Sequence, residues 1–414
     1  MKYRELRKYY YAGEETYLKE YDSRFQSPDT VHVKFHIGEH EAFFVENTAV
    51  LRLNVEIERL DKQVMKLSMQ LPEVAKKQYS VKCLIDEIIL TNKIEGVHSS
   101  RREIGDALEV LAKQSAEKEE HPRFLSLVNK YLKLMIQEPV SLETCEDIRK
   151  IYDEMLLDEV IEEDPESAPD GKLFRKSSAT VYDATGKAIH QGLNPEDRIL
   201  EAMGEALTFL NDDAVEPIYR VCLFHYLLEY IHPFYDGNGR LGRFILSYCI
   251  SEMMEPLLAY RISETIKENR KEYYAAFEIC NDRLNRGDLT PFLLMQMEMI
   301  RSAFQDLKDS LESKLTLWKR YERLVPELPG AEGNENQCML YSLLIQAALF
   351  SESGISTKEL MLQFDMTYNP VKKLIDQVPE NMLIIRKKGN AKYYQMDLAV
   401  LDRILLKRAE NEIR

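Results

Sequence analysis

The chain contains 414 residues, of which 45% are hydrophobic and 30% are charged, a composition typical of a soluble globular protein with about two or three domains. Its formal net charge of −15 argues against a protein that binds nucleic acid or membranes over its whole surface, although a local basic patch stays compatible with it. The sequence has neither a run of about eighteen apolar residues nor an apolar signal-peptide core, so we expect no membrane segment. The six cysteines are scattered without paired spacing, which indicates reduced thiols and a cytoplasmic protein.

Residues 1–50 are rich in tyrosine and charge, and we expect them to be partly irregular, with one short strand near Val31–Phe35. Their sequence indicates no function. From about Leu51 to Ile94 the apolar residues recur at helical spacing, which predicts two helices separated at Pro72.

The second of these helices is expected to stop at Gly96, because glycine readily adopts the left-handed conformation of a C-terminal cap. Ser100 and Glu103 have the spacing of a capping box, so another helix should begin there. Glu95 then lies in a last helical turn, where a carboxylate is mildly unfavourable, although most such glutamates are simply solvated. Residues 101–165 are predicted to continue as helices, with their acidic runs in loops or caps.

The stretch from Leu173 to Gln191 differs in character from the helical sequence before it. Two short β-favouring pieces, 180–182 and 187–190, flank the turn-forming sequence DATG, which predicts a small exposed hairpin. The open edge of such a hairpin could pair with an extended peptide of a partner protein. An ordinary surface hairpin is the alternative.

The most informative stretch is His232–Arg243, which reads HPFYDGNGRLGR. An apolar helical run from Pro217 to Tyr230 leads into it, and a second helical run leads out of it to about Glu255. The stretch therefore predicts a tight loop that ends as the first turn of a helix.

The backbone around Asn238 is predicted to form an anion cradle. Gly237 and Gly239 flank this residue, so successive N–H groups can turn inward with no Cβ in the way, at the positive end of the following helix. Arg240 and Arg243 lie three residues apart on one face of the first turn, where cations oppose the helix dipole. Together these features favour a polyphosphate ligand.

The same loop carries reactive side chains. His232 is the only one of them that can take a proton near neutral pH, which suits a general base. Asp236 is a hard oxygen ligand beside the cradle and could hold Mg²⁺ against phosphates. Phe234 and Tyr235 are expected to anchor the loop in the core. Any one of these residues alone would usually be structural, so it is their combination that indicates function.

The helices after the loop contain Tyr273, Tyr274 and Asn281, whose default role is packing on a helix face. Thr290, followed by a proline, predicts the start of a closing helix with Thr290 as its cap. That helix and a successor should extend to about Leu324.

A linker is predicted at 326–337, followed by a small domain at 338–414. Three helices and a terminal hairpin are expected there, an arrangement that resembles a winged helix-turn-helix. Basic side chains of the third helix and the hairpin could meet phosphates, yet acidic residues balance the basic ones across the domain. We therefore expect either DNA or a protein as its partner; the basic residues are Lys372, Lys373, Arg386, Lys387, Lys388 and Lys392.

The run His232–Arg243 resembles the signature of the Fic family, His-x-Phe-x-Asp/Glu-Gly-Asn-Gly-Arg-x-x-Arg, at every defined position. The resemblance implies transfer of a nucleoside monophosphate, most often AMP from ATP, to a protein hydroxyl. It assigns the general base to His232 and the Mg²⁺ ligand to Asp236. It also implies a nucleotide-binding set made of Gly237, Asn238, Gly239, Arg240 and Arg243.

Thr91, Glu95 and Gly96 match the inhibitory motif of the same family, Ser/Thr-x-x-x-Glu-Gly/Asn. The resemblance implies that Glu95 pairs with Arg243 and occupies the γ-phosphate site, so that ATP binds with its α-phosphate turned away from the hydroxyl. One arginine cannot serve a carboxylate and a phosphate at once. Because the motif precedes the signature in the same chain, inhibition would be intramolecular.

Two further features are similar to parts of Fic proteins. The predicted hairpin near 180–190 resembles the flap that aligns the backbone of the target protein beside the active site. Tyr274 and Asn281 resemble the residues that meet the nucleoside, the first by stacking and the second by hydrogen bonding.

The sequence thus predicts a mainly α protein with a Fic-type helical core, a hairpin flap and a C-terminal winged helix-turn-helix domain. The expected function is an autoinhibited protein adenylyltransferase that uses ATP and Mg²⁺ to modify a Ser, Thr or Tyr of a target or of itself. The predicted modules are 1–145, which carries the inhibitory motif, 146–325, the catalytic core with trailing helices, 326–337, the linker, and 338–414, the winged helix.

Other functions stay open at this point. Glu95 could orient a water molecule so that the enzyme removes AMP, and other Fic proteins transfer UMP, phosphocholine or phosphate. A DNA-binding regulator that only senses nucleotide would not need His232. A zinc hydrolase would use His225 and His232, which share a helical face, but no third ligand has suitable spacing, and His225 is expected to pack in the core. The target protein and a homodimer are not readable from the sequence.

Overall fold

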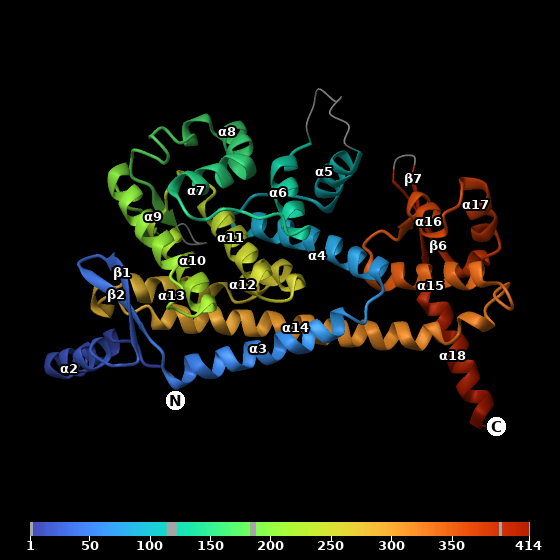
Figure 1. Cartoon of the computed structure of the whole chain (residues 1–414), viewed down its shortest axis with the longest axis horizontal. Coiled ribbons are helices and arrows are strands. Elements are labelled where there is room, and N and C mark those ends of the chain that lie inside the picture. Colours follow the sequence, from blue (N-terminus) through green and yellow to red (C-terminus); the bar gives the residue numbers. More distant parts are fainter. Residues whose placement is uncertain (1–2, 114–121, 183–187, 389–390, 414) are drawn as a thin grey trace. The chain divides into compact units, whose positions relative to one another are not determined.

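The computed structural model describes residues 3–113, 122–182, 188–388 and 391–413 (Figure 1). The fold is mainly helical, as predicted, and its described strands form two hairpins and one three-stranded sheet. The chain forms two compact units, one made of residues 1–62 and 84–307 and the other of residues 63–83 and 308–414. Three long helices therefore contribute residues to both units, a division that differs from the modules expected from the sequence.

The N-terminal segment of the first unit is more regular than expected. It contains α1 (Arg7–Tyr10), α2 (Glu14–Phe25) and an antiparallel hairpin of β1 (Thr30–Ile37) and β2 (His40–Val45). The sequence analysis was wrong to predict a single strand in partly irregular chain. Alternate residues of β1 are buried at its end, and ring packing between Phe25 and Phe43 holds α2 against β2.

The two helices predicted between Leu51 and Ile94 are confirmed as α3 (Thr48–Ser68) and α4 (Glu73–Ile94), separated at Pro72. The predicted capping box at the start of α5 (Arg101–Lys113) is also present. The backbone N–H of Ser100 donates to the Glu103 carboxylate at 2.8 Å, and the N–H of Glu103 donates to the Ser100 hydroxyl at 3.3 Å.

A helical core follows, and α10 lies at its centre, packed between α9 and α11. Helix α10 is apolar on nearly all faces and buried all round, which is the pattern of a helix surrounded by others. The elements of this core are α6 (Leu125–Met135), α7 (Cys145–Tyr152), the π-helix η1 (Asp153–Leu157), α8 (Asp158–Glu163), the 3₁₀ helix η2 (Pro165–Ser167), α9 (Glu196–Leu210), α10 (Pro217–Ile231) and α11 (Asn238–Met253).

The predicted hairpin is present as β3 (Thr180–Tyr182) and β4 (Ala188–Gln191), which pair antiparallel with Thr180 opposite Gln191. Residues 183–187, in the predicted turn, lie outside the described part of the chain.

The first unit closes with η3 (Pro256–Arg261), α12 (Ile262–Glu268), α13 (Arg270–Asn281), η4 (Arg283–Asn285) and the first part of α14 (Thr290–Glu322). The sequence analysis predicted two helices here, but α14 is one helix of 33 residues. The predicted capping role of Thr290 is also wrong. Its hydroxyl accepts from the N–H of Val45 at 2.9 Å, and the Asp288 carboxylate accepts from the N–H of Thr290 at 3.0 Å.

In the second unit, three helices and a hairpin follow one another as predicted, and Ser356 and Glu359 cap the second helix in both directions. A short strand, β5 (Ile355–Ser356), and a last helix, α18 (Leu398–Ile413), were not predicted. The sheet has the order β5–β7–β6. The elements are η5 (Val325–Glu327), α15 (Glu335–Phe350), β5 (Ile355–Ser356), α16 (Thr357–Phe364), α17 (Tyr368–Asp376), η6 (Glu380–Met382), β6 (Leu383–Lys388), β7 (Ala391–Met396) and α18 (Leu398–Ile413).

All six cysteines have free thiols. Within the described ranges, no helix combines the length and the apolar character that crossing a bilayer requires.

Candidate active site

The signature loop joins α10 to α11 through two residues in the left-handed region. His232 caps the end of α10 with φ at 52°, which is uncommon for a residue with a Cβ. Gly237 precedes α11 with φ at 82°, a conformation that glycine adopts without strain. The two turns place the histidine just ahead of the N-terminus of α11.

Side chains within the loop brace this conformation. Phe234 is fully buried, and its ring stacks on that of Tyr152 at a centroid distance of 3.7 Å. The Asn238 amide accepts from the N–H of Phe234 at 3.0 Å and donates to its carbonyl at 2.9 Å. The hydroxyl of Tyr235 donates to Asp170 at 3.0 Å. The side chain of Asn238, which we predicted to bind nucleotide, is therefore engaged with the loop backbone.

The first turn of α11 presents backbone donors. The bond that closes the helix at its start runs from the N–H of Leu241 to the carbonyl of Gly237, at 3.0 Å. The N–H of Gly237 donates to the carboxylate of Asp236 at 2.6 Å. The N–H groups from Asn238 to Arg240 belong to the helix end that intrahelical bonds cannot satisfy, which is the geometry of an anion site.

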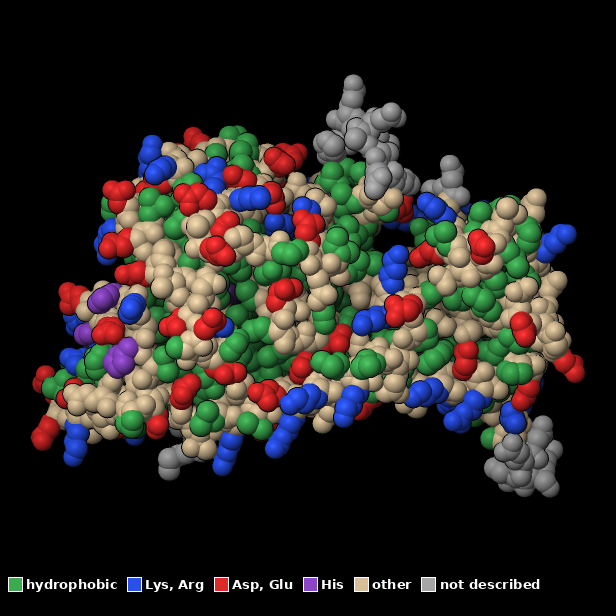
Figure 2. Space-filling model, in the orientation of Figure 1, with side chains coloured by type: hydrophobic (Ala, Val, Ile, Leu, Met, Phe, Trp, Pro, Cys, Tyr) green, Lys and Arg blue, Asp and Glu red, His purple; other side chains and the backbone are tan. Residues whose placement is uncertain are grey.

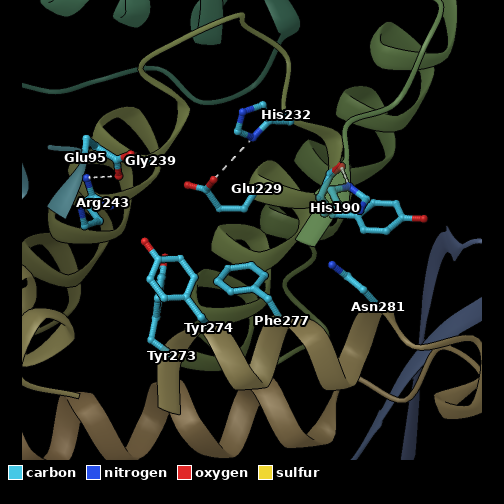
Figure 3. Close-up of a pocket in the computed structure, with 11 residues that line it drawn as sticks. Glu95, His190, Glu229, His232, Gly239, Arg243, Tyr273, Tyr274, Phe277 and Asn281 are labelled. Atoms are coloured by element: carbon cyan, nitrogen blue, oxygen red, sulfur yellow. Dashed lines mark hydrogen bonds and ion pairs between the residues drawn. The ribbon is translucent and has the colours of Figure 1, made fainter. Parts of the chain in front are cut away.

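A pocket opens beside this helix end. Figure 3 shows Glu95 with Gly239 and Arg243 at one end, His232 and Glu229 in the middle, and His190 and Asn281 at the other end, above α13. The lining residues are Glu95, His190, Glu229, Tyr230, His232, Gly239, Arg243, Tyr273, Tyr274, Phe277 and Asn281.

The predicted inhibitory residues meet Arg243 in this pocket. A Glu95 carboxylate oxygen lies 2.7 Å from an Arg243 guanidinium nitrogen. The same guanidinium donates to the Thr91 hydroxyl at 2.8 Å and to the Thr91 carbonyl at 3.1 Å. Gly239 makes this approach possible, because a Cβ there would lie 2.1 Å from the Glu95 oxygen. Gly96, with φ at 81°, follows the end of α4.

The two charges stabilise each other. Burial by itself would raise the pKa of Glu95, but the charge of Arg243 and its hydrogen bond outweigh burial, so the pKa lies below its usual value. Burial alone would lower the pKa of Arg243, but the charge of the Glu95 carboxylate outweighs burial and raises this pKa above its usual value. Arg243 is 1% exposed, whereas the Glu95 side chain keeps 30% exposure, so solvent and ligands can still reach the carboxylate.

His232 is poised as a neutral imidazole. Its side chain is 13% exposed, and burial lowers its pKa to about 4, helped by the positive charge of Arg175 and by His190. Its Nδ1 lies 3.8 Å from a carboxylate oxygen of Glu229, one turn earlier on α10. A neutral imidazole can accept a proton, which is the requirement for a general base.

Glu229 is a site residue that the sequence analysis missed. Burial and the nearby charge of Glu95 together raise its pKa to about 8. One of its carboxylate oxygens and Nδ1 of His232 are buried, and neither has a hydrogen-bond partner among the described residues. The sequence did contain a signal for this role, because Glu229 is the one carboxylate in the apolar helix α10 and lies near its end, next to the loop.

Arg175 and His190 are also parts of the site that the sequence did not indicate. Arg175 is fully buried and donates to the carbonyls of His232 at 2.8 Å and Leu193 at 2.9 Å, so it ties the loop to the segment after the hairpin. A ring nitrogen of His190, on β4, lies 2.6 Å from the carbonyl of Tyr230, and the two rings stack. These contacts dock the hairpin beside the end of α10. Nothing in the local sequence distinguished either residue.

Arg240 and Arg243 diverge, although they are three residues apart. Arg240 is fully buried, and its guanidinium donates to Glu159 of α8 at 2.6 Å. A second nitrogen of the guanidinium lies 3.6 Å from Asp236. Arg240 does not line the pocket, so its predicted contact with the β- or γ-phosphate stays a prediction.

Asp236 fits the predicted Mg²⁺ ligand in its chemistry. Its side chain is 48% exposed and beside the N-terminus of α11, and a single carboxylate is sufficient where phosphate oxygens and water complete the octahedron. In the described part of the chain, no three His, Cys, Asp or Glu side chains converge as a protein-only metal site would require.

Tyr274 and Asn281 both line the pocket from α13. The amide oxygen of Asn281 accepts from the Tyr226 hydroxyl at 2.6 Å, which leaves its nitrogen directed toward the cavity (Figure 3). His225, one half of the zinc alternative, is 1% exposed and bonds the Tyr273 hydroxyl at 2.7 Å, so it packs in the core as expected.

The comparisons with known proteins agree with this geometry. Residues 142–250 match the sequence model of the Fic/DOC family. Protein adenylyltransferase fic-1 of Caenorhabditis elegans is 29% identical over 155 residues, which cover 36% of this chain and 28% of that protein. Protein adenylyltransferase Fic of Culex quinquefasciatus is 25% identical over 242 residues, or 57% of this chain and 44% of that protein. The chain thus spans less than half the length of these relatives.

A crystal structure of a Fic family protein from Desulfovibrio desulfuricans superimposes with a TM-score of 0.51 at 18% identity, covering 84% of this chain and 96% of that one. At this identity the likeness concerns the fold. The family match covers the loop and the helices that flank it, and three residues of the signature, His232, Gly239 and Arg243, line one pocket. The chain therefore contains a Fic domain, which the family match places at residues 142–250.

Proposed function

We propose that the protein transfers AMP from ATP to the hydroxyl of a Ser, Thr or Tyr in a protein target. The observation that carries this proposal is the juxtaposition, in one pocket, of a neutral His232, the open N-terminus of α11 and the guanidinium of Arg243. A base for the hydroxyl, amide donors for phosphates and a cation for the terminal phosphate are the parts that phosphoryl transfer needs. The names of the relatives, protein adenylyltransferases, support the same activity.

In the proposed reaction, a ring nitrogen of His232 takes the proton of the target hydroxyl. The hydroxyl oxygen forms a bond to the α-phosphorus of ATP as the bond to the β-phosphate oxygen breaks, and pyrophosphate leaves. The amides at the start of α11 and Arg243 hold the negative charge of the phosphates. Asp236 would hold Mg²⁺, which supplies charge neutralisation between the phosphates when bound.

The contact between Glu95 and Arg243 supports autoinhibition. The carboxylate occupies the guanidinium that a γ-phosphate would need, and it lies against Gly239 at the start of α11. ATP must then either displace the carboxylate or bind in another pose. The pocket itself does not select the base, so UMP transfer is a variant of the same proposal.

The proposal is tested by incubating the protein with Mg²⁺ and ATP labelled on the α-phosphate. We expect incorporation into protein to rise at least about 10-fold in Glu95→Gly, because a charge-assisted pair of about 1.5–3 kcal/mol no longer blocks Arg243. His232→Ala in the same background should abolish incorporation. Lys93→Gly is the matched control, since it loosens the same exposed helix end and keeps the carboxylate.

Two results would overturn the proposal. If His232→Ala keeps the label, the histidine is not the base. If Lys93→Gly activates as strongly as Glu95→Gly, the carboxylate is not the inhibitor.

Glu95 also supports a second activity, removal of AMP from a modified protein. It is partly exposed and lines the same pocket as His232, so it could orient a water molecule toward the phosphorus. A purified AMP-modified protein should then lose its label with the wild type and keep it with Glu95→Gly. We further propose that the target lies along the β3–β4 hairpin, because His190 docks β4 beside His232.

A further inference from the structure

The second unit carries a basic surface that the proposed transfer reaction does not use. We propose that helix α17 and the β6–β7 hairpin bind double-stranded DNA, with α17 in the major groove and the hairpin against the phosphate backbone. Between Tyr368 and Met396 the chain has six Lys and Arg residues but only two Asp and Glu, although the whole chain has 55 and 70 respectively. The excess positive charge is therefore local.

Four lysines of this surface are free to meet phosphates. Lys372 and Lys373 on α17 and Lys387 and Lys392 on the hairpin form no ion pair or side-chain hydrogen bond with the described residues. Some other lysines of the same unit are engaged. Lys314, for example, donates to the carbonyl of Leu349 at 2.5 Å.

The hairpin places like charges against each other. Lys387 lies directly opposite Lys392 in the antiparallel register of β6 and β7, an arrangement that destabilises a two-stranded ribbon. The Arg386 guanidinium donates to the carbonyl of Glu352 at 2.8 Å and so fixes the hairpin to the loop after α15. A polyanion lying across the hairpin would relieve the repulsion between the two lysines.

Helix α17 presents side chains that can read base edges. Val371 and Ile375 are buried against the unit, so the opposite face is exposed and carries Asn369, Lys372 and Lys373. Asn pairs with adenine and Lys with guanine in the major groove. The order of α16, α17 and the hairpin is that of a winged helix-turn-helix, in which the second helix of the pair enters the groove.

A protein partner is the competing occupant, because exposed apolar side chains lie on the same elements. Leu362 on α16 is 71% exposed and Ile385 on β6 is 52% exposed. We favour DNA because the unpaired charge is concentrated here. Acidic side chains accompany the basic ones over much of the described face shown in Figure 2, whereas the segment from Tyr368 to Met396 has six basic residues and two acidic ones.

Binding is tested on the full chain by fluorescence anisotropy with a labelled duplex of about 30 base pairs and mixed sequence, from about 50 to 200 mM KCl. We expect the wild type to bind and to lose about 100-fold in affinity across this range, as about four phosphate contacts require. In the quadruple variant, Gln replaces Lys372, Lys373, Lys387 and Lys392. It should bind at least about 10-fold more weakly at low salt, and its plot of log affinity against log salt concentration should be less steep by up to about 3.6.

The matched control carries the same charge change at exposed lysines on other helices, namely Lys19, Lys66, Lys77 and Lys407, each changed to Gln. It should bind like the wild type. Equal thermal midpoints by circular dichroism show that both variants fold. A double-stranded RNA of the same sequence should bind more weakly, because a helix cannot enter its deep, narrow major groove.

The proposal is overturned if the wild type fails to bind the duplex at about 50 mM KCl, which would leave the surface to a protein partner. It is also overturned if the quadruple variant binds as well as the control, or if RNA binds as tightly as DNA.

Discussion

The guanidinium of Arg243 has three partners on one helix end: the carboxylate of Glu95 and the hydroxyl and carbonyl of Thr91. The resemblance to the family's inhibitory motif implied the first contact, and the two contacts of Thr91 were not predicted. Sequence could not predict where Arg240 goes, since its partner Glu159 comes from a distant helix. Two arginines on one helical face can thus have different partners, which tertiary packing alone decides.

The protonation of His232 leads to a prediction on pH dependence. In the free protein the pKa of His232 is about 4. The negative charge of Glu95 raises this pKa, so the pKa should be lower still in a variant without the carboxylate. Bound phosphates add negative charge and raise it again. The value of kcat/KM for ATP reports protonation in the free enzyme. In Glu95→Gly, protonation of His232 should therefore not lower kcat/KM between about pH 5 and 8.

The acid limb of kcat should lie at higher pH than that of kcat/KM, because kcat reports the nucleotide complex. Steady-state rates measured from about pH 3.5 to 8 check the order of the two limbs. A limb of kcat below that of kcat/KM would contradict the assignment of His232 as the base.

Glu229 gives a prediction on stability. Its pKa is raised to about 8 in the folded protein, so between about pH 4.5 and 8 the unfolded chain releases a proton that the folded chain retains, and stability falls as pH rises. Glu229→Gln removes this loss. We expect the variant to be more stable than the wild type by roughly 1–3 kcal/mol at pH 8 and nearly equal to it at pH 5, measured by urea unfolding. A variant that is less stable at both pH values would show that the carboxylate is ionised and paired.

At the scale of elements, the helices and their ends were readable where periodicity and caps agree, as in α4, α10 and α16. Prediction failed where tertiary contacts decide. The strand β2 is held by backbone hydrogen bonds between Phe43 and residues 287 and 289, far along the chain. Two helices were expected where α14 is one continuous helix, whose residues fall in both units. Cap assignment at Thr290 failed for the same reason, since its hydroxyl is used by Val45.

The C-terminal end of α4 has a second anchor besides Arg243. Arg270 of α13 donates to the carbonyl of Ile94 at 2.9 Å, just before Glu95. Arg270→Met should loosen this end and raise AMP incorporation about 3- to 10-fold, because an intramolecular hydrogen bond contributes a net of roughly 1 kcal/mol. Lys271→Met, at the exposed neighbouring position, is the control and should leave incorporation unchanged. Equal activity of both variants in the labelled ATP assay would remove Arg270 from the inhibitory contact.

At the scale of the whole molecule, the N-terminal segment is tied to the far end of the catalytic unit. Arg24 is 9% exposed and lies 3.0 Å from Asp288, which is fully buried and also accepts from the Tyr3 hydroxyl at 2.7 Å. Composition suggested a partly irregular segment of no assigned role, because this partnership spans more than 260 residues and leaves no local pattern. The segment holds the connection between α13, which carries Tyr274 and Asn281, and α14.

Breaking this pair should be costly. Arg24→Met leaves a buried carboxylate without its main counter-charge, so we expect a loss of about 3 kcal/mol in the free energy of unfolding. Arg7→Met, which removes a partly exposed arginine from the same segment, should change it by less than about 1 kcal/mol. Denaturant titrations of the two variants check the difference, and equal losses would mean that Asp288 is satisfied by its other donors.

Helix α4 belongs to both compact units: its residues up to Cys83 count with the second, and those from Leu84 with the first. Glu95, which pairs with Arg243, follows directly on the half of α4 that belongs to the first unit. Because each turn of an α-helix is hydrogen-bonded to the next, a substitution that shifts this half should shift Glu95 with it and leave every catalytic side chain in place.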